Sequence, residues 1–396
     1  MDAESRVTTL LGDPRKAILA MVLPILLSLL VSEVNTLADR AWCSGLGVDA
    51  LAAISVVRPI YNVYVGLGTG LGVGAAAVIS RKIGAGKASE ASSCGIQAMI
   101  LALIFCAILT PTMYLLQSGL LDVVGSEDIH DISVEYMTCY TLCLTLIVMN
   151  GVVAGILNGQ GAAGLSTAMM MTLAVGNMIL DPIFIYTFDM GVSGAAWATV
   201  IALAITSFIP FYWYLYRKDT FVRIEKKDFV KDKKARSDIL AVGFPEMLEL
   251  SLMYLFNILL NYFVIICGGT DAVAIYTTSW KIVALGVVPA QAIGGALVSV
   301  CSAEYGMRRF DAIADAFRYS IRITMLSMAG VAILIIASAM PIAMAFTTGE
   351  NTIHIRSELE HVLIIMALFA PFFALVYPSS STTSSSRSMA TLMESR

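Results

Sequence analysis

The chain has 396 residues, of which 58% are hydrophobic and 14% charged, and its mean hydropathy is +0.81. A typical soluble protein is about 45–50% apolar and about 25% charged, so this composition excludes a soluble enzyme, a disordered chain and a soluble nucleic-acid binder. The net charge of −4 indicates no particular partner. At about 20 apolar residues per crossing, we expect an all-α, multi-pass protein of the cell membrane.

The apolar runs predict ten transmembrane helices. Lipid offers no water to backbone polar groups, so runs of this length can span it only as helices. The first run follows a polar lead that has no signal-peptide cleavage site, and we expect it to stay in the protein. The predicted spans are residues 18–42, 51–79, 92–116, 132–157, 166–188, 195–216, 239–267, 272–300, 320–346 and 359–377.

Lysine and arginine are concentrated in alternate connections between these spans. Residues 217–236 hold nine of the 25 basic residues, whereas residues 117–131 hold none. Basic loops face the cytoplasm, so we expect the N-terminus and the central linker to be cytoplasmic, and we interpret the linker as a solvated tether rather than a nucleic-acid site. The resulting organisation is an N-lobe (1–216), a basic linker (217–238), a C-lobe (239–377) and a serine-rich tail outside the membrane (378–396).

An internal repeat supports this division into two lobes. Pro24 and Pro245 are 221 positions apart, and Gly84 and Gly306, each after the second span of its lobe, are 222 apart. An even number of crossings separates the copies, which predicts parallel repeats related by an axis along the membrane normal. The glycines at 66, 70 and 74 predict close helix packing, because a dinucleotide-binding loop would need a preceding strand.

Polar residues inside the apolar runs form the candidate site. An aspartate at the bilayer centre costs about 2.5–3.5 kcal/mol, so each one calls for a partner, a cavity or a bound cation. Asp39 and Asp181 each follow an asparagine by four residues, which places Asn35 and Asn177 on the same helix faces. With Thr199, these oxygens suit a small hard cation such as Na⁺, and they equally suit a proton carrier.

Two structural interpretations compete with this site: Asp39 pairs with Arg40 at the membrane interface, or Asp181 lies at a helix break before Pro182. Pro182 cannot donate a backbone hydrogen bond and leaves a carbonyl free, so we expect a hinge there. In the C-lobe, Glu249 and Lys281 are candidates for a cavity. The sequence contains no HExxH, GxSxG or paired-cysteine motif, and it predicts no catalytic residues, no cofactor and no metal other than Na⁺ at the site.

These residues resemble the multidrug and toxic compound extrusion (MATE) transporters over about 360 residues. The resemblance rests on Pro24, Asp39, the Arg81–Gly84 connection and the block from Gly176 to Thr199. It implies two six-helix lobes around a central cleft, and export of small organic, often cationic, compounds in exchange for Na⁺ or H⁺. It also implies that Asp39, Asn177, Asp181 and Thr199 form the cation site and that Pro24 marks a bend in the first helix. We expect a monomer that contacts its substrate, the coupling cation and the bilayer, and no nucleic acid.

The end of the chain departs from the family pattern. After Tyr377 the serine-rich run does not predict a span, so the sequence predicts a C-lobe of four helices where the resemblance implies six, and we interpret the difference as a truncation or a frameshift. Two other functions stay open. A flippase for a lipid-linked precursor would have a cleft lined by basic residues rather than by Asp39 and Asp181, and a membrane-embedded enzyme would need a catalytic constellation that the sequence does not show.

Overall fold

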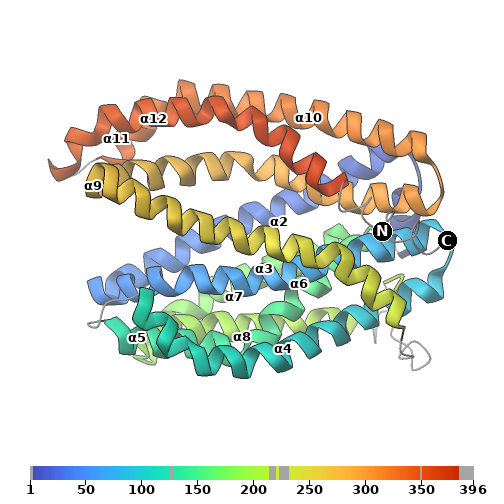
Figure 1. Cartoon of the computed structure of the whole chain (residues 1–396), viewed down its shortest axis with the longest axis horizontal. Helices are drawn as coiled ribbons and strands as arrows, with labels where there is room; N and C mark the ends of the chain where they lie inside the picture. The colour runs from blue at the N-terminus through green and yellow to red at the C-terminus, as the bar shows by residue number, and fades with distance from the viewer. Residues whose placement is uncertain (1–2, 125–128, 214–219, 223–231, 348–349, 383–396) are drawn as a thin grey trace.

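The computed structural model describes residues 3–124, 129–213, 220–222, 232–347 and 350–382. It is helical, and the helices form two groups (Figure 1): α3 to α8 lie in the lower part of the view and α10 to α12 in the upper part, while α2 and the first half of α9 run obliquely between them. We call α2 to α8 the N-lobe and α9 to α12 the C-lobe. The helices are α1 (Ala3–Leu10), α2 (Pro14–Cys43), α3 (Val48–Gly84), α4 (Ala88–Val124), α5 (His130–Leu142), α6 (Leu144–Gly159), α7 (Ala163–Pro182), α8 (Gly191–Tyr212), α9 (Lys233–Gly306), α10 (Phe310–Ala337), α11 (Ala339–Phe346) and α12 (Arg356–Phe369).

The expectation of a multi-pass, all-α membrane protein is confirmed. Within the described residues, nine helices are long and apolar enough to cross a membrane, and the bent pair α5 and α6 would make a tenth. The long helix α9 contains two of these spans, because the backbone turns at Gly269, where φ is +69°. A positive φ is accessible to glycine at little cost, so Gly269 provides the turn between the seventh and eighth predicted spans.

Several predicted boundaries were wrong. The span at 132–157 is two helices that meet at Cys143 with a bend of 50°. The span at 320–346 starts ten residues earlier, at Phe310, and the last helical segment continues to Thr382, five residues into the predicted tail. The polar lead forms the short helix α1. Most of the basic linker lies outside the described residues.

Glycines allow α3 to pack closely against the C-lobe. A Cβ atom added at Gly74 would overlap the carbonyl oxygen of Ile239, and one at Gly70 would lie 2.6 Å from the backbone nitrogen of Met247, both in the first half of α9. At Gly66 the added atom would lie 3.4 Å from Leu250. The stripe at 66, 70 and 74 is therefore a packing surface, as predicted, and it joins the two lobes.

The lobes also meet where α3 and α9 end, at the end of the molecule that we call the linker end. A Cβ atom at Gly84 would overlap the carbonyl oxygen of Ala303, and one at Gly306 would overlap that of Arg81. Because the two glycines are equivalent in the repeat, this contact is reciprocal. Arg81 also donates to Asp238 at 2.6 Å, across the lobes. The linker end is thus closed, and we call the opposite end, near the turn in α9, the Gly269 end.

Candidate functional site

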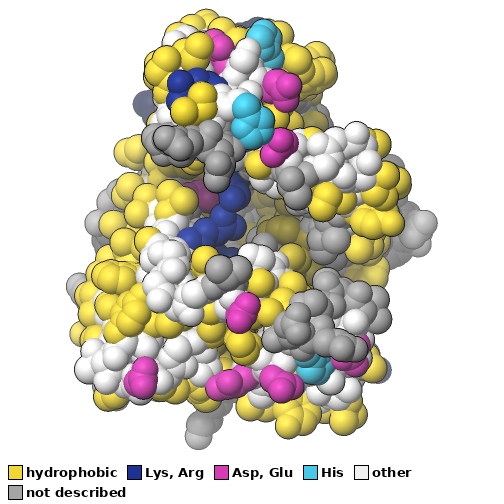
Figure 2. All heavy atoms as spheres, turned by 90° about the vertical axis from the view of Figure 1, so that its left-hand side faces the viewer, with side chains coloured by type: hydrophobic (Ala, Val, Ile, Leu, Met, Phe, Trp, Pro, Cys, Tyr) yellow, Lys and Arg dark blue, Asp and Glu magenta, His cyan; other side chains and the backbone are white. Residues whose placement is uncertain are grey.

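A cavity of about 350 Å³ toward the Gly269 end is lined by residues of the N-lobe and, from the C-lobe, by Lys281, and we call it the interlobe cavity. Viewed from that end, the molecule is hollowed between its upper and lower halves, and Lys and Arg side chains are visible inside the hollow (Figure 2). Five helices bring charged or polar side chains to the cavity wall: Asp39 from α2, Arg58 from α3, Asp181 from α7, Thr199 from α8 and Lys281 from α9. Residues that are far apart in the sequence thus share one chamber.

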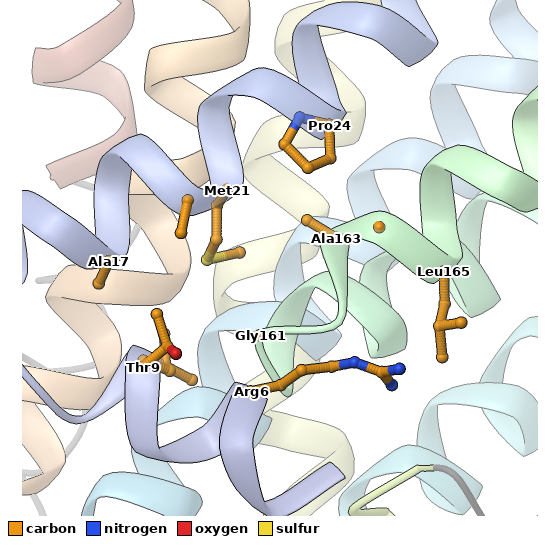
Figure 3. Close-up of a pocket in the computed structure, with 11 residues that line it drawn as sticks. Arg6, Thr9, Ala17, Met21, Pro24, Gly161, Ala163 and Leu165 are labelled. Atoms are coloured by element: carbon orange, nitrogen blue, oxygen red, sulfur yellow. The ribbon is translucent and has the colours of Figure 1, made fainter. Parts of the chain in front are cut away.

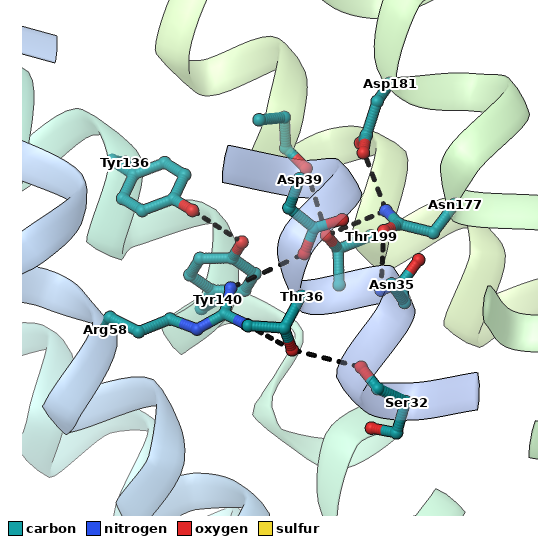
Figure 4. Close-up of polar contacts among 11 residues, drawn as sticks. Ser32, Asn35, Thr36, Asp39, Arg58, Tyr136, Tyr140, Asn177, Asp181 and Thr199 are labelled. Carbon is teal, nitrogen blue, oxygen red and sulfur yellow. Dashed lines mark hydrogen bonds and ion pairs between the residues drawn. The ribbon is translucent and has the colours of Figure 1, made fainter. Parts of the chain in front are cut away.

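The predicted site residues of the N-lobe lie together (Figure 4): Asn35, Asn177, Asp181 and Thr199 share one hydrogen-bonded network, and Asp39 lies beside it, bonded to Arg58. Asn35 Nδ2 donates to Asn177 Oδ1 at 3.0 Å, and Asn177 Nδ2 lies 3.1 Å from both Asp181 Oδ1 and Thr199 Oγ1. The carboxyl groups of Asp39 and Asp181 line the same cavity and are close enough for their charges to interact. Asn177 and Asp181 are each only 1% exposed. The four-residue spacings thus bring both amides to the same place as both acids.

Acceptor oxygens in this network outnumber the donors that reach them. Among the described residues, no donor reaches Asn35 Oδ1, Asp39 Oδ1 or Asp181 Oδ2, although all three atoms are buried. Two carboxylates this close repel each other when both are ionised, and buried acceptors without a donor are costly. A proton or a small cation with a preference for oxygen ligands would relieve both costs. The arrangement can therefore bind and release positive charge.

Asp39 forms an ion pair with Arg58, and not with Arg40 as one interpretation of the sequence proposed. Its Oδ2 atom lies 3.5 Å from Arg58 on α3, not beside its neighbour Arg40. Arg58 also donates to Thr36 at 3.1 Å, and its guanidinium lies 5.7 Å from the centre of the Tyr61 ring. The sequence analysis missed this role of Arg58, because a single arginine in a long apolar run gives no sign of its partner.

Two tyrosines that the sequence analysis also missed complete the wall beside Arg58. Tyr140 donates its hydroxyl hydrogen to Tyr136 at 3.0 Å, and their rings meet edge to face at 5.1 Å between centres. Both rings line the cavity. Their four-residue spacing on α5 is the sequence signal that could have found them, since it places two aromatic rings on one helix face.

The other predicted positions divide between the cavity and its surroundings. Lys281 lines the cavity, whereas the exposed Glu249 accepts a hydrogen bond from Ser380 at 3.3 Å and is not among the residues that line it. Pro182 ends α7, and the chain continues as a π-helical turn at Ile183–Thr187. Asp181 thus lies at a helix break, as the competing interpretation proposed, and also faces Asp39.

Pro24 lies away from this cavity, beside a second one of about 280 Å³ near the linker end (Figure 3). Arg6 and Met21 line the same space, and Thr167 Oγ1 donates to the Pro24 carbonyl at 2.6 Å. At a rise of about 1.5 Å per residue, Pro24 is about 22 Å from Asp39 along α2. A bend at Pro24 would therefore act at a distance from the acid pair.

A protein-family model covers both lobes of this chain. The MatE family model matches residues 24–183 and 245–393. The chain belongs to the MatE family. These are the MATE transporters that the sequence resembles, so the protein is a transporter and not an enzyme. The two matched ranges begin at Pro24 and Pro245, the positions that define the predicted repeat, and the second includes most of the serine-rich segment that we had set apart.

Individual MATE proteins are similar over most of the chain. The multidrug export protein MepA of Staphylococcus saprophyticus is 26% identical over 359 residues, which are 89% of this chain and 76% of that protein. MepA of Staphylococcus aureus (strain MSSA476) is 28% identical over 68% of this chain, an alignment that spans 59% of that protein. A multidrug resistance MATE transporter solved in an outward-facing conformation is 33% identical, with a TM-score of 0.92, and the match covers 98% of this chain and 86% of that one.

Proposed function

We propose that this chain is a secondary active antiporter that exports small organic compounds in exchange for Na⁺ or H⁺ by alternating access. The observation that carries the proposal is the pair Asp39 and Asp181, which share one interlobe cavity with a network of amides. The names of the similar proteins, multidrug export protein and multidrug resistance transporter, support the substrate class. The protein acts as a monomer within the lipid bilayer, and its partners are the substrate and the coupling cation.

The closed linker end and the hollow at the Gly269 end support alternating access. With the basic linker on the cytoplasmic side, as its charge predicts, the closed linker end faces the cytoplasm and the hollow at the Gly269 end faces outward. A cation or proton enters from outside and neutralises Asp39 and Asp181. Helix α2 then repacks, with Pro24 as its bend, and the substrate leaves. A ligand shifts such an equilibrium only by its different affinity for the two states, so charge at the acid pair is the coupling.

The test removes the charge of each acid and keeps its shape. Asp39→Asn and Asp181→Asn proteins are reconstituted, and efflux of a fluorescent dye from vesicles is driven by a Na⁺ gradient or a pH gradient imposed separately. We expect both replacements to abolish ion-driven export while membrane insertion stays intact. Normal transport by both variants would refute the assignment, and the gradient that drives the native protein identifies the coupling ion.

A flippase for a lipid-linked precursor is the second candidate, and one observation favours it. The cavity contains the basic residues Arg40, Arg58 and Lys281. A flippase was expected to have basic residues instead of Asp39 and Asp181, whereas here acidic and basic residues line the same cavity. Translocation of a fluorescent anionic lipid by reconstituted protein, measured by quenching from one side of the vesicle, distinguishes the two functions.

A further inference from the structure

Two of the basic residues in the interlobe cavity have no acidic partner. Arg58 pairs with Asp39, but neither Arg40 nor Lys281 forms an ion pair with a carboxylate in the part of the chain that the structure describes. Arg40 belongs to α2 in the N-lobe and Lys281 to α9 in the C-lobe. Both side chains line this one cavity. Positive charge from both lobes therefore faces the same space.

The acidic groups near this space do not cancel that charge locally. Asp39 and Asp181 line the same cavity, and Asp39 is already paired with Arg58. Glu33, one turn and a half before Asp39 on α2, and Asp39 both attract Arg40, but among the described residues neither forms an ion pair with it. Three basic side chains line the cavity, against the two acids Asp39 and Asp181, so the basic groups outnumber the acids even while both acids are ionised. The cavity therefore repels a simple organic cation and attracts an anion.

We propose that Arg40 and Lys281 together bind the anionic group of the exported compound, a carboxylate or a phosphate ester carried by an aromatic amphiphile. This inference rests on the proposed export function and specifies its substrate class. A guanidinium and an ammonium hold such a group with charge-assisted hydrogen bonds. The rings of Tyr136 and Tyr140 provide the apolar surface for an aromatic body. The preferred substrates are thus anionic or zwitterionic compounds rather than the plain organic cations that the family resemblance implied.

Arg40 and Lys281 come from different lobes, and this affects which substrates the cavity selects. Because one comes from each lobe, an anion between them replaces a repulsion across the cleft by two attractions. A compound that lacks the anion leaves the repulsion in place. Arg40 and Lys281 therefore discriminate between compounds of the same shape that differ only in the charge of one group.

A matched pair of dyes tests this directly. Rhodamine B has a free carboxylate, and its methyl ester has the same rings without the negative charge. Binding of each dye to purified full-length protein in neutral-lipid nanodiscs is measured by fluorescence polarisation. We expect the carboxylate dye to bind more tightly, and Arg40→Gln or Lys281→Gln to weaken its binding about tenfold each, the loss that removing one charge-assisted hydrogen bond predicts. The ester should bind both variants at least as well as the native protein.

The controls separate charge from general damage. Lys281→Arg keeps the charge and should retain tight binding of the carboxylate dye, and Arg318→Gln, at an exposed position on α10, should change neither dye. Repeating the titration in discs that contain phosphatidylglycerol shows the source of the anion: competition that depends on Lys281 indicates a lipid phosphate, and its absence indicates a soluble compound. Equal weakening of both dyes by the Gln variants, or tighter binding of the ester to the native protein, overturns the proposal. No ion gradient enters this assay, so its outcome is independent of the antiport test.

Discussion

The ion pair between Arg81 and Asp238 is predicted to hold the linker end closed. It joins α3 of the N-lobe to the start of α9 in the C-lobe at 2.6 Å, and the two side chains are only 8% and 13% exposed. Asp238→Asn removes the charge and keeps the shape. A hydrogen bond to a charged group contributes about 1.5–3 kcal/mol when it is sheltered from water. A loss of about 2–3 kcal/mol increases the population with an open linker end by about 30- to 150-fold.

Native cysteines provide the assay for this opening. Cys301, on α9 near the linker end, is fully buried in a cluster that includes Ile18 and Met21 of α2, so it reacts with a maleimide only when the lobes separate there. Its labelling rate, measured by mass spectrometry of the reconstituted protein, should rise by the same 30- to 150-fold. Cys106 is buried inside the N-lobe and should stay unreactive, whereas the exposed Cys267 should react in every sample. Faster labelling of Cys106 as well would indicate general unfolding instead of opening.

A second ion pair at the same end supplies the matched control. Glu90 pairs with Lys87 at 2.8 Å and with Lys82, all within the N-lobe, and its side chain is 44% exposed. Exposed pairs contribute about 0–1 kcal/mol, and this one does not cross the lobes. Glu90→Gln should therefore leave Cys301 labelling unchanged. If Asp238→Asn left it unchanged too, the ion pair would not be what keeps the linker end shut.

Two further predictions concern stability, measured as thermal unfolding of the purified protein in detergent. Gly72→Ala should destabilise by about 1–3 kcal/mol, since its Cβ would overlap the Gly151 carbonyl, whereas Gly119→Ala meets no atom within 4 Å and should be neutral or slightly stabilising; equal effects would contradict the packing argument. Asn177→Ala should cost about 1–2 kcal/mol, because it removes the buried link between Asn35 and Asp181. Thr172→Ala, on the exposed side of the same helix, should cost far less, and a similar cost would sink the network interpretation.

The sequence predicted those features of the fold that depend on local periodicity. Runs of apolar residues gave the spans, because lipid imposes one solution on them. The glycine stripe at 66, 70 and 74 gave a helix contact, although nothing in it identified α9 as the partner. The predicted helix boundaries were wrong where a helix begins with polar residues. Helix α10 begins among residues such as Asp311 and Arg318, which a hydropathy criterion places outside the membrane. The bend at Cys143 could not be predicted, because no proline or glycine lies next to it in the sequence.

The candidate site was predicted in part for a related reason. Asparagine four residues before aspartate is a local pattern, and it occurs once around Asp39 and once around Asp181, so each half of the network was visible separately. The pairing of Arg58 with Asp39 and the approach of Lys281 depend on how α3 and α9 cross. That crossing is set by packing over the whole length of both helices, which no short stretch of sequence specifies.

The repeat and the site together explain why the two lobes have different tasks. At the repeat offset of 221, Asp39 corresponds to Leu260, so the C-lobe lacks the acid that would give it a second coupling site of the same kind. Lys281, by contrast, lies one residue from the position equivalent to Arg58 at an offset of 222, and both basic residues reach the same cavity. In the proposed antiport, charge that enters from outside is therefore sensed by one lobe, while the basic residues proposed to bind the substrate come from both. Such a protein can use a change of charge in the N-lobe to alter the fit between the lobes, because the proposed substrate site bridges them and the proposed ion site does not.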